Sequence, residues 1–344
     1  MVSLKKYIPL LFILLFFSCK KKSSNITPAF YHWQTEFQLE NSEKTYLQNF
    51  PIKKIYVKFF DVDWHSSGEP LPQAEVIWNE KIQEDIEIIP TIFITNRSLK
   101  NYPLEKMEGL GENILDKIFE LLPTEKQDIS EIQIDCDWSG TTKEKYFHLL
   151  SFLRKNISKK KIKLSATIRL HQIKFFKQTG IPPVDKGMLM FYNVGEVTNM
   201  ETKNSILDLA IAKQYLGNFE KYPLQLDLAL PIFSWGVLFR DGKMIKLMSG
   251  LEVTQLLDQE RFIKTADNFF QIKKSTYLDG RYLYEGDEIR LESVSLEGLQ
   301  ETAHLLKNHL SNNDLTISFY HLDTATIKHF QYEKLKDICD IFLQ

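Results

Sequence analysis

The sequence predicts an α/β fold, a (β/α)8 TIM barrel with a β-rich insertion between its seventh strand and the helix that follows. Eight apolar runs of strand length alternate with helix-like stretches along the 344 residues, and such alternation is typical of a parallel sheet. The chain is long enough for eight βα units. An open doubly wound sheet would carry a glycine-rich phosphate turn after its first strand, and residues 33–42, WQTEFQLENS, contain no glycine.

The first four units follow one another without interruption. We expect strands over residues 29–37, 53–64, 86–95 and 131–138, followed by helices near 41–50, 75–85, 105–122 and 142–157. The fourth helix has the clearest pattern, because apolar residues recur at i, i+3, i+4 and i+7 on one face. These residues are Tyr146, Leu149, Leu150 and Leu153.

The last four units contain the insertion. We expect strands over residues 161–170, 186–195, 223–233 and 315–323, with helices over 171–179, 201–219 and 295–310 and one near the C-terminus. Residues from about 240 to 294 separate the seventh strand from its helix. They carry the turn signals RDGK and LDGRYLYEGDE, which predict a β-rich segment.

The N-terminus has the pattern of a secretion signal. Lys5 and Lys6 precede an apolar run over residues 8–17 that is too short to span a bilayer. Ser18 and Cys19 follow, and the segment resembles a bacterial lipoprotein signal in which the cysteine is lipidated. We therefore expect a signal peptide over residues 1–19, a polar tether over 20–28 and the barrel over 29–344. That makes the protein a membrane-anchored lipoprotein facing the periplasm. An ordinary signal peptide with a chance cysteine is the alternative.

Composition and cysteine placement exclude some classes of function. The formal net charge is -2, with no basic stripe beyond the tether, so we expect no nucleic-acid partner. No cysteine pair has metal-ligand spacing, and we expect neither a metal nor a cofactor. Cys136 and Cys339 fall on opposite sides of the predicted barrel, so they should stay unpaired. Nothing in the sequence indicates a protein partner.

Polar residues gather where the predicted strands end. In (β/α)8 barrels the active site lies at the C-terminal ends of the strands. The candidates there are Glu36, Asp61, Asp63, Asp135, Asp137, Trp138, Arg169, His171, Tyr192, Asn193, His321 and Asp323. For any one of them, a buried ion pair that only satisfies itself is an equally good explanation. The whole set at one end predicts a site.

Strand alternation predicts which side chains face the lumen. Side chains two apart share a face. On the fourth strand this places Gln133, Asp135 and Asp137 together, and we expect them to face the lumen. On the fifth strand the corresponding set is Ser165, Thr167, Arg169 and His171, and on the first strand it is His32, Gln34 and Glu36.

Two motifs resemble family 18 glycoside hydrolases, the chitinase type. IQIDCDWS (132–139) is similar to that family's fourth-strand pattern D-x-D-x-E, and MFYN (190–193) to its sixth-strand Met-x-Tyr-Asp. Ser139 falls where the family has its general acid, and Asn193 where it has Asp. FYHWQTEF, KFFDVDW and DCDW also resemble a family of bacterial lipoproteins with a glycosidase-like barrel. That second resemblance implies a fold and no particular reaction.

We therefore predict a glycoside hydrolase-like protein that acts on or binds a glycan. Two carboxylates would share the chemistry, with Asp137 as general acid, Asp135 orienting it and Tyr192 steadying the substrate. Glu36 or Asp63 is the alternative candidate for the second catalytic carboxylate. Four tryptophans at or near strand ends would stack on sugar rings, with Trp138 the first choice: Trp33, Trp64, Trp138 and Trp235. Substrate contacts are also expected from Arg169, His171, Asn193, His321 and Asp323.

Two other functions remain open from the sequence. Ser139 in the place of the family's acid favours a barrel that binds a glycan without hydrolysing it. A metal-dependent hydrolase could use Asp61, Asp63, His171, His321 and Asp323, although no H-x-H or H-x-x-x-H spacing supports it.

Overall fold

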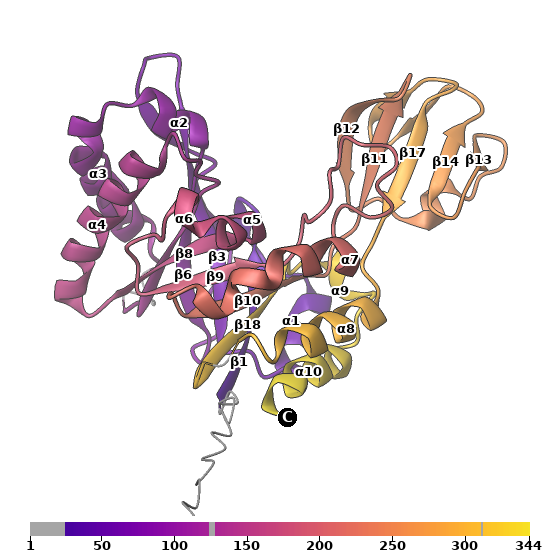
Figure 1. Ribbon diagram of the computed structural model, residues 1–344. Coiled ribbons are helices and arrows are strands. Elements are labelled where there is room, and N and C mark those ends of the chain that lie inside the picture. Colours follow the sequence, from indigo (N-terminus) through magenta and orange to yellow (C-terminus); the bar gives the residue numbers. More distant parts are fainter. Residues whose placement is uncertain (1–24, 124–127, 311) are drawn as a thin grey trace, which may run out of the picture.

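The computed structural model, which describes residues 25–123, 128–310 and 312–344, contains a closed barrel of eight parallel strands (Figure 1). The strand order is β1-β18-β10-β9-β8-β7-β6-β3, and β1 pairs with β3 to close it. The strands are β1 (Asn25–His32), β3 (Lys54–Trp64), β6 (Glu87–Ile94), β7 (Glu131–Asp135), β8 (Lys163–Arg169), β9 (Lys186–Met190), β10 (Leu226–Pro231) and β18 (Asp314–Tyr320). The predicted barrel is confirmed.

Helices cover the outside of the barrel (Figure 1). The longer ones are α1 (Asn41–Asn49), α3 (Met107–Leu121), α4 (Lys143–Ile157), α8 (Leu296–Leu306) and α10 (Tyr332–Asp340). The shorter ones are α2 (Asn96–Asn101), α5 (Leu170–Lys174), α6 (Phe176–Thr179), α7 (Leu209–Ala212) with a 3₁₀ turn over Lys213–Lys221, and α9 (Thr324–Ile327). On α4 the four residues of the predicted apolar face are buried.

The helix predicted over residues 75–85 is wrong. The chain after β3 instead turns back as β4 (Pro70–Gln73), which pairs antiparallel with β3, and then forms β5 (Ile77–Trp78). β5 pairs with β2 (Glu36–Phe37). Ile77 is β-branched and Trp78 is aromatic, and both types favour extended backbone. Pairing with β2 satisfies backbone groups of β5.

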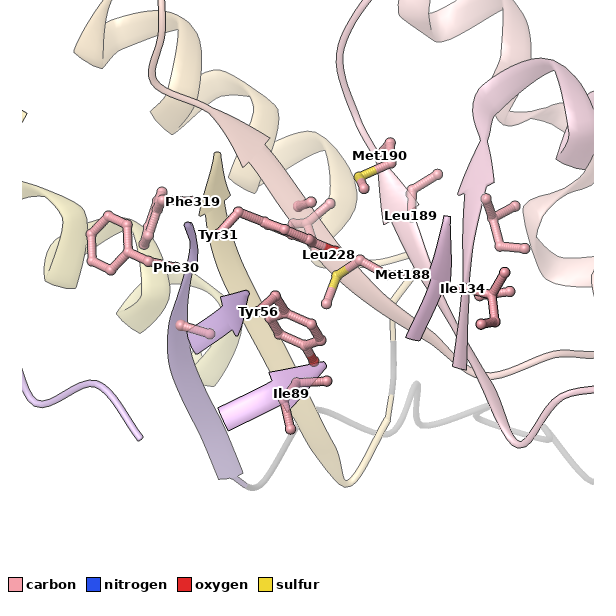
Figure 2. Packing of buried hydrophobic residues seen from close by; sticks show 14 of the residues in the cluster. Phe30, Tyr31, Tyr56, Ile89, Ile134, Met188, Leu189, Met190, Leu228 and Phe319 are labelled. Atoms are coloured by element: carbon pink, nitrogen blue, oxygen red, sulfur yellow. The ribbon is translucent and has the colours of Figure 1, made fainter. Parts of the chain in front are cut away.

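The two faces of β1 pack against different layers (Figure 2). Phe30 packs outward against Phe50 beyond α1, with ring centroids 5.9 Å apart. Tyr31 faces the lumen, stacks on Tyr56 at 5.0 Å and donates a hydrogen bond to Gln133. His32 therefore lies on the outward face. The expectation that His32, Gln34 and Glu36 face the lumen is wrong, because both faces of β1 are apolar and polarity does not mark the inner one.

Charged side chains also fill the opposite, N-terminal end of the barrel. Lys186 Nζ lies 2.8 Å from Glu131 and 2.6 Å from Asp227, and Lys54 approaches Glu131 at 3.6 Å. Glu131 is 1% exposed. Buried carboxylates are stable when they are paired in this way. Buried charge at a barrel end is therefore not by itself a sign of function.

The insertion is a separate β-sheet that projects from the barrel (Figure 1). Its strands are β11 (Trp235–Arg240), β12 (Lys243–Ser249), β13 (Phe262–Lys264), β14 (Phe269–Ile272) and β17 (Glu288–Glu292), with a hairpin of β15 (Thr276–Leu278) and β16 (Arg281–Leu283). It has its own apolar core, which includes Leu238, Phe270 and Ile289. The predicted β-rich insertion is confirmed, and it begins at Trp235, earlier than the residue near 240 that the turn signals marked.

The predicted signal peptide and most of the tether lie outside the described residues. β1 begins at Asn25, so residues 25–28, which we expected to belong to the tether, pair with β18. Within the described part of the chain, no helix combines the length and apolarity needed to cross a bilayer. Cys136 and Cys339 are both buried and free.

Candidate functional site at the barrel mouth

A cavity of about 510 Å³ opens at the C-terminal ends of the barrel strands. Its walls come from the ends of β6, β7, β8, β9 and β18, from the loops that follow them and from the base of the insertion. Strands that lie far apart in the sequence therefore meet at one concave surface, which is the usual place for a ligand site in this fold.

One wall of the cavity is a carboxylate–guanidinium cluster. Arg169 Nη2 lies 3.2 Å from Asp135 Oδ1, and Arg169 Nε lies 2.5 Å from Asp137 Oδ1. Thr167 donates a 2.5 Å hydrogen bond to Asp135. β7 and β8 are parallel neighbours, and alternation places all four side chains on the lumen face. Four members of the predicted lumen-facing set are therefore brought together here, whereas His171 lies on α5 outside this cavity.

The two aspartates lie in different environments. Asp135 is buried, and burial raises the pKa of its carboxyl group, while the nearby Arg169 charge opposes that rise. The Asp137 side chain is 59% exposed. The Asp135 carboxylate is therefore buried below the cavity surface, and the Asp137 carboxylate is exposed to the cavity.

Aromatic rings form a second, continuous wall. Tyr192 packs against Tyr320 and Phe233, with centroids 5.5 and 5.8 Å apart. Phe233 contacts Trp235 at 5.3 Å, and Tyr320 contacts Trp33 at 5.9 Å. All five rings line the cavity. Such rings offer flat apolar surfaces with polar tips, and they suit one face of a pyranose.

Trp235 is oriented by a buried ion pair. Its indole N–H donates to Glu292 Oε2 at 2.9 Å. Glu292 also accepts from Arg290 Nε at 2.6 Å and from the Ser205 hydroxyl at 2.6 Å. Arg290 in turn donates to the backbone carbonyls of Val197, Asn199 and Met200. Arg290 and Glu292 of β17 thus hold in place both the Trp235 ring and the loop that follows β9.

The third wall holds a histidine and an aspartate. His321 Nε2 lies 3.1 Å from Asp323 Oδ2, and Asp323 caps α9 by accepting from the Thr326 N–H at 2.8 Å. Burial lowers the pKa of His321, although Asp323 opposes this. Behind it, burial and the neighbouring His321 lower the pKa of His32 to about 4. Both imidazoles are therefore neutral near pH 7.

A second hollow of about 290 Å³ adjoins the main cavity. Asp137, Arg169, Tyr192 and Asn193 line both, and His171 contributes to the second. Asn193 has φ 54°, in the left-handed region that asparagine tolerates better than most residues. The two hollows therefore share a wall that includes the Asp137–Arg169 pair.

Two predicted carboxylates lie outside this cavity. Glu36 is exposed and accepts from Asn79 at 3.1 Å. Asp63 pairs with Arg97, which lowers the pKa of Asp63 to about 2, and accepts from Thr95 at 2.7 Å. Neither lines either hollow at the mouth. Asp63 lies near the end of β3 and Glu36 at the start of β2, and each is bound to local partners outside the cavity.

The structure contradicts Trp138 as a sugar platform. It is 1% exposed, stacks on Tyr146 at 5.1 Å and donates to the Thr179 carbonyl at 3.0 Å. Because Trp138 follows Asp137 by one position, it points to the opposite side, into the helix layer. Trp235 and Trp33 line the cavity instead.

Ser139 does not line either hollow at the barrel mouth. Its hydroxyl lies 2.9 Å from the Thr141 hydroxyl, and its N–H donates to Thr142 in the turn before α4. β7 ends at Asp135, so Asp137 is the last side chain of the run to reach the cavity.

The metal-dependent alternative gains no support. In the described residues, no three His, Cys, Asp or Glu side chains lie together in a way that could hold a metal ion. Of its proposed ligands, Asp61 pairs with Lys58 at 3.3 Å and Asp63 with Arg97.

Sequence reasoning missed Phe93, Phe233 and Tyr320 as cavity residues. It also missed Arg290 and Glu292 as the pair that orients Trp235. For the last pair a signal existed. Arg290 and Glu292 are opposite charges two apart, so they share one face of a strand.

The fold is that of a glycosidase-like TIM barrel. The chain is similar to the spore cortex-lytic enzyme SleL of Bacillus megaterium QM B1551, with TM-score 0.56 and 14% identity over 92% of this chain and 75% of that one. The chain is also similar to a family 18 N-acetylglucosaminidase from Paenibacillus barengoltzii, with TM-score 0.54 and 12% identity over 91% of this chain and 100% of that one. A third similar structure is Ostrinia furnacalis group II chitinase catalytic domain 2, solved with a chitooligosaccharide. Its TM-score is 0.53, with 10% identity over 92% of this chain and 96% of that one. No family model and no curated protein matches the sequence.

Proposed function

We propose that the protein is a glycoside hydrolase-like barrel that binds a glycan at its mouth and cleaves it there. The observation that carries the proposal is the cavity itself, in which an Asp135–Arg169–Asp137 cluster faces a wall of five aromatic rings. Polar groups that converge beside aromatic surfaces are what a sugar ring requires, because its faces are apolar and its edge is polar.

The geometry supports a shifted alignment with the family 18 pattern. If D-x-D-x-E is placed two residues earlier than in the sequence alignment, Gln133, Asp135 and Asp137 take its three positions. Each of these side chains faces the lumen. In this alignment Asp137 replaces the general acid, and Ser139 has no catalytic part.

Asp137 would protonate the leaving glycosidic oxygen as the bond from that oxygen to the anomeric carbon breaks. A water molecule would complete hydrolysis by adding hydroxide to the carbon and a proton to a carboxylate. Asp135 would hold Arg169 in place, and Tyr192 would steady the sugar beside it. Arg169 Nε must release Asp137 while Asp137 carries the proton.

A second candidate is binding without cleavage. The 2.5 Å contact between Arg169 and Asp137 favours it, because an ion-paired carboxylate is a poor proton donor. The two functions share the same cavity and differ in whether substrate binding breaks this ion pair.

Replacing Asp137 with Asn separates these functions. Turnover of soluble oligosaccharides, followed by mass spectrometry, should fall by two or more orders of magnitude if Asp137 is the acid. Affinity by calorimetry should change less than turnover, and the melting temperature should stay within a few degrees, because the side chain is exposed. If the wild-type protein binds glycans and cleaves none, the binding function is correct. Wild-type turnover that Asp137→Asn leaves intact would rule out the assigned acid.

We also propose that Cys19 is lipidated and anchors the protein to a membrane, facing the periplasm. The support is the apolar run followed by Ser18 and Cys19 in the sequence. The Cys19→Ala protein should leave the membrane fraction on cell fractionation. If it remains there, the anchor is wrong.

A further inference from the structure

We infer that the mouth cavity selects glycans that carry free amino groups, that is, amino sugars without N-acetylation. The inference rests on the proposed function, because it names the substrate class of the same cavity. Its basis is the combination of excess negative charge and aromatic surface within one concave site.

The charges that line the cavity do not balance. Three carboxylates, those of Asp135, Asp137 and Asp323, face it together with one guanidinium, that of Arg169. The remaining titratable side chain with a charged form near neutral pH is His321, which burial keeps neutral. A neutral glycan would leave the excess charge uncompensated, and an anionic one would be repelled.

Two of these carboxylates lie on opposite sides of the mouth. Asp137 follows β7 and Asp323 follows β18, four places apart in the ring of eight strands. Asp137 pairs with Arg169 through one oxygen and is 59% exposed. Asp323 uses its oxygens on His321 and on the α9 cap. An ammonium group has three donors, so a sugar amine beside either carboxylate gains a charge-assisted hydrogen bond.

The aromatic wall favours the same ligand. Trp33, Phe233, Trp235 and Tyr320 line the cavity and are only partly buried. Faces of aromatic rings attract cations, most strongly where water is excluded. Acetylation removes the positive charge and leaves a neutral amide, so it removes both the Coulombic and the cation–π contributions. Each neutral sugar ring would retain stacking alone.

Calorimetry on the full-length protein tests this with three oligosaccharides of equal length: glucosamine, N-acetylglucosamine and glucose oligomers with the same β-1,4 linkage. The glucosamine oligomer should bind roughly tenfold or more tightly than the other two, as one or two cation contacts imply. That advantage should shrink in high salt, because screening weakens charge attraction.

Asp323→Asn is the matched variant, because Asn removes the charge and still caps α9. It should lower the ratio of glucosamine-oligomer affinity to glucose-oligomer affinity severalfold. Asp116→Asn, an exposed position on α3, changes net charge equally and should leave the preference unchanged.

The outcomes separate the two proposals. Equal binding of all three oligomers, or tighter binding of the acetylated one, overturns the amine preference and leaves the glycan site standing. No binding of any oligomer overturns both.

Discussion

Arg169 lies between Asp135 and Asp137, 3.2 Å from a carboxylate oxygen of the first and 2.5 Å from one of the second. Burial alone would favour the neutral form of Asp135, and the guanidinium works against this. Arg169 therefore favours the charged form of Asp135, and its side chain lines both the main cavity and the adjoining hollow.

Arg169→Gln should destabilise the protein in a pH-dependent way. At neutral pH the loss should be ~3 kcal/mol, the scale for leaving a buried carboxylate without its partner. The folded-state pKa of Asp135 is already raised, and without Arg169 it should rise further. A raised folded pKa contributes stability that is present below the unfolded value and is lost as pH rises through the folded value.

The variant should therefore recover stability relative to wild type as the pH falls from 7 towards 4. Chemical denaturation at several pH values measures this. A deficit that stays constant with pH would mean that Asp135 is not the group left unpaired.

Trp235→Phe should weaken glycan binding, whereas Trp138→Phe should lower stability only. The first removes the bond to Glu292 at the cavity wall and should weaken glycan binding severalfold, with a stability loss of about 1 kcal/mol. The second removes core volume and the bond to Thr179, so it should cost about 2 kcal/mol of stability and leave affinity unchanged. Calorimetry and thermal denaturation of both variants measure this. An affinity loss in Trp138→Phe alone would restore the sequence-based platform.

At the scale of elements, β17 ties the insertion to the loop over residues 193–205. Arg290 and Glu292 have fully buried side chains and bond to that loop through four of its residues. The insertion is therefore fixed to the barrel at the point where Trp235 enters the cavity wall.

Glu292→Gln should loosen this junction. The buried Arg290 would lose its ion-pair partner at a cost of ~3 kcal/mol or more. Cleavage within residues 196–204 should become faster in limited proteolysis. Glu201→Gln, an exposed change in the same loop, is the control and should cleave like wild type. Equal cleavage of all three proteins would show that the ion pair does not hold the loop.

At the scale of the whole molecule, the barrel keeps its two described cysteines apart. Cys136 points from β7 into the helix layer, and Cys339 lies on the apolar face of α10, which packs against β1 and α8. Burial raises the pKa of both thiols, so neither is a ready nucleophile.

Both should resist alkylation in the native protein and react fully once it is unfolded without reductant. Peptide mapping after differential alkylation measures each residue separately. A crosslinked Cys136–Cys339 peptide would contradict the strand order on which the whole site depends.

The sequence alone determined the architecture, because a parallel barrel repeats one signal eight times and each βα unit is a local pattern. It also located Asp135, Asp137 and Arg169, since strands β7 and β8 have one polar and one apolar face. For β1 the same reasoning failed: Tyr31 and His32 lie on faces of similar polarity, so alternation could not tell inside from outside.

Only the tertiary structure decided which strand-end residues share a cavity. Asp63 lies near the end of β3 and Asp137 just after β7, but Arg97 binds the first outside the cavity while Arg169 holds the second at the cavity wall. Trp235 and Glu292 are 57 residues apart. Trp33 directly follows the first strand of the barrel, and Tyr320 ends the last one. Such pairings depend on barrel closure and on the docking of the insertion, which arise from long-range packing that no local pattern records.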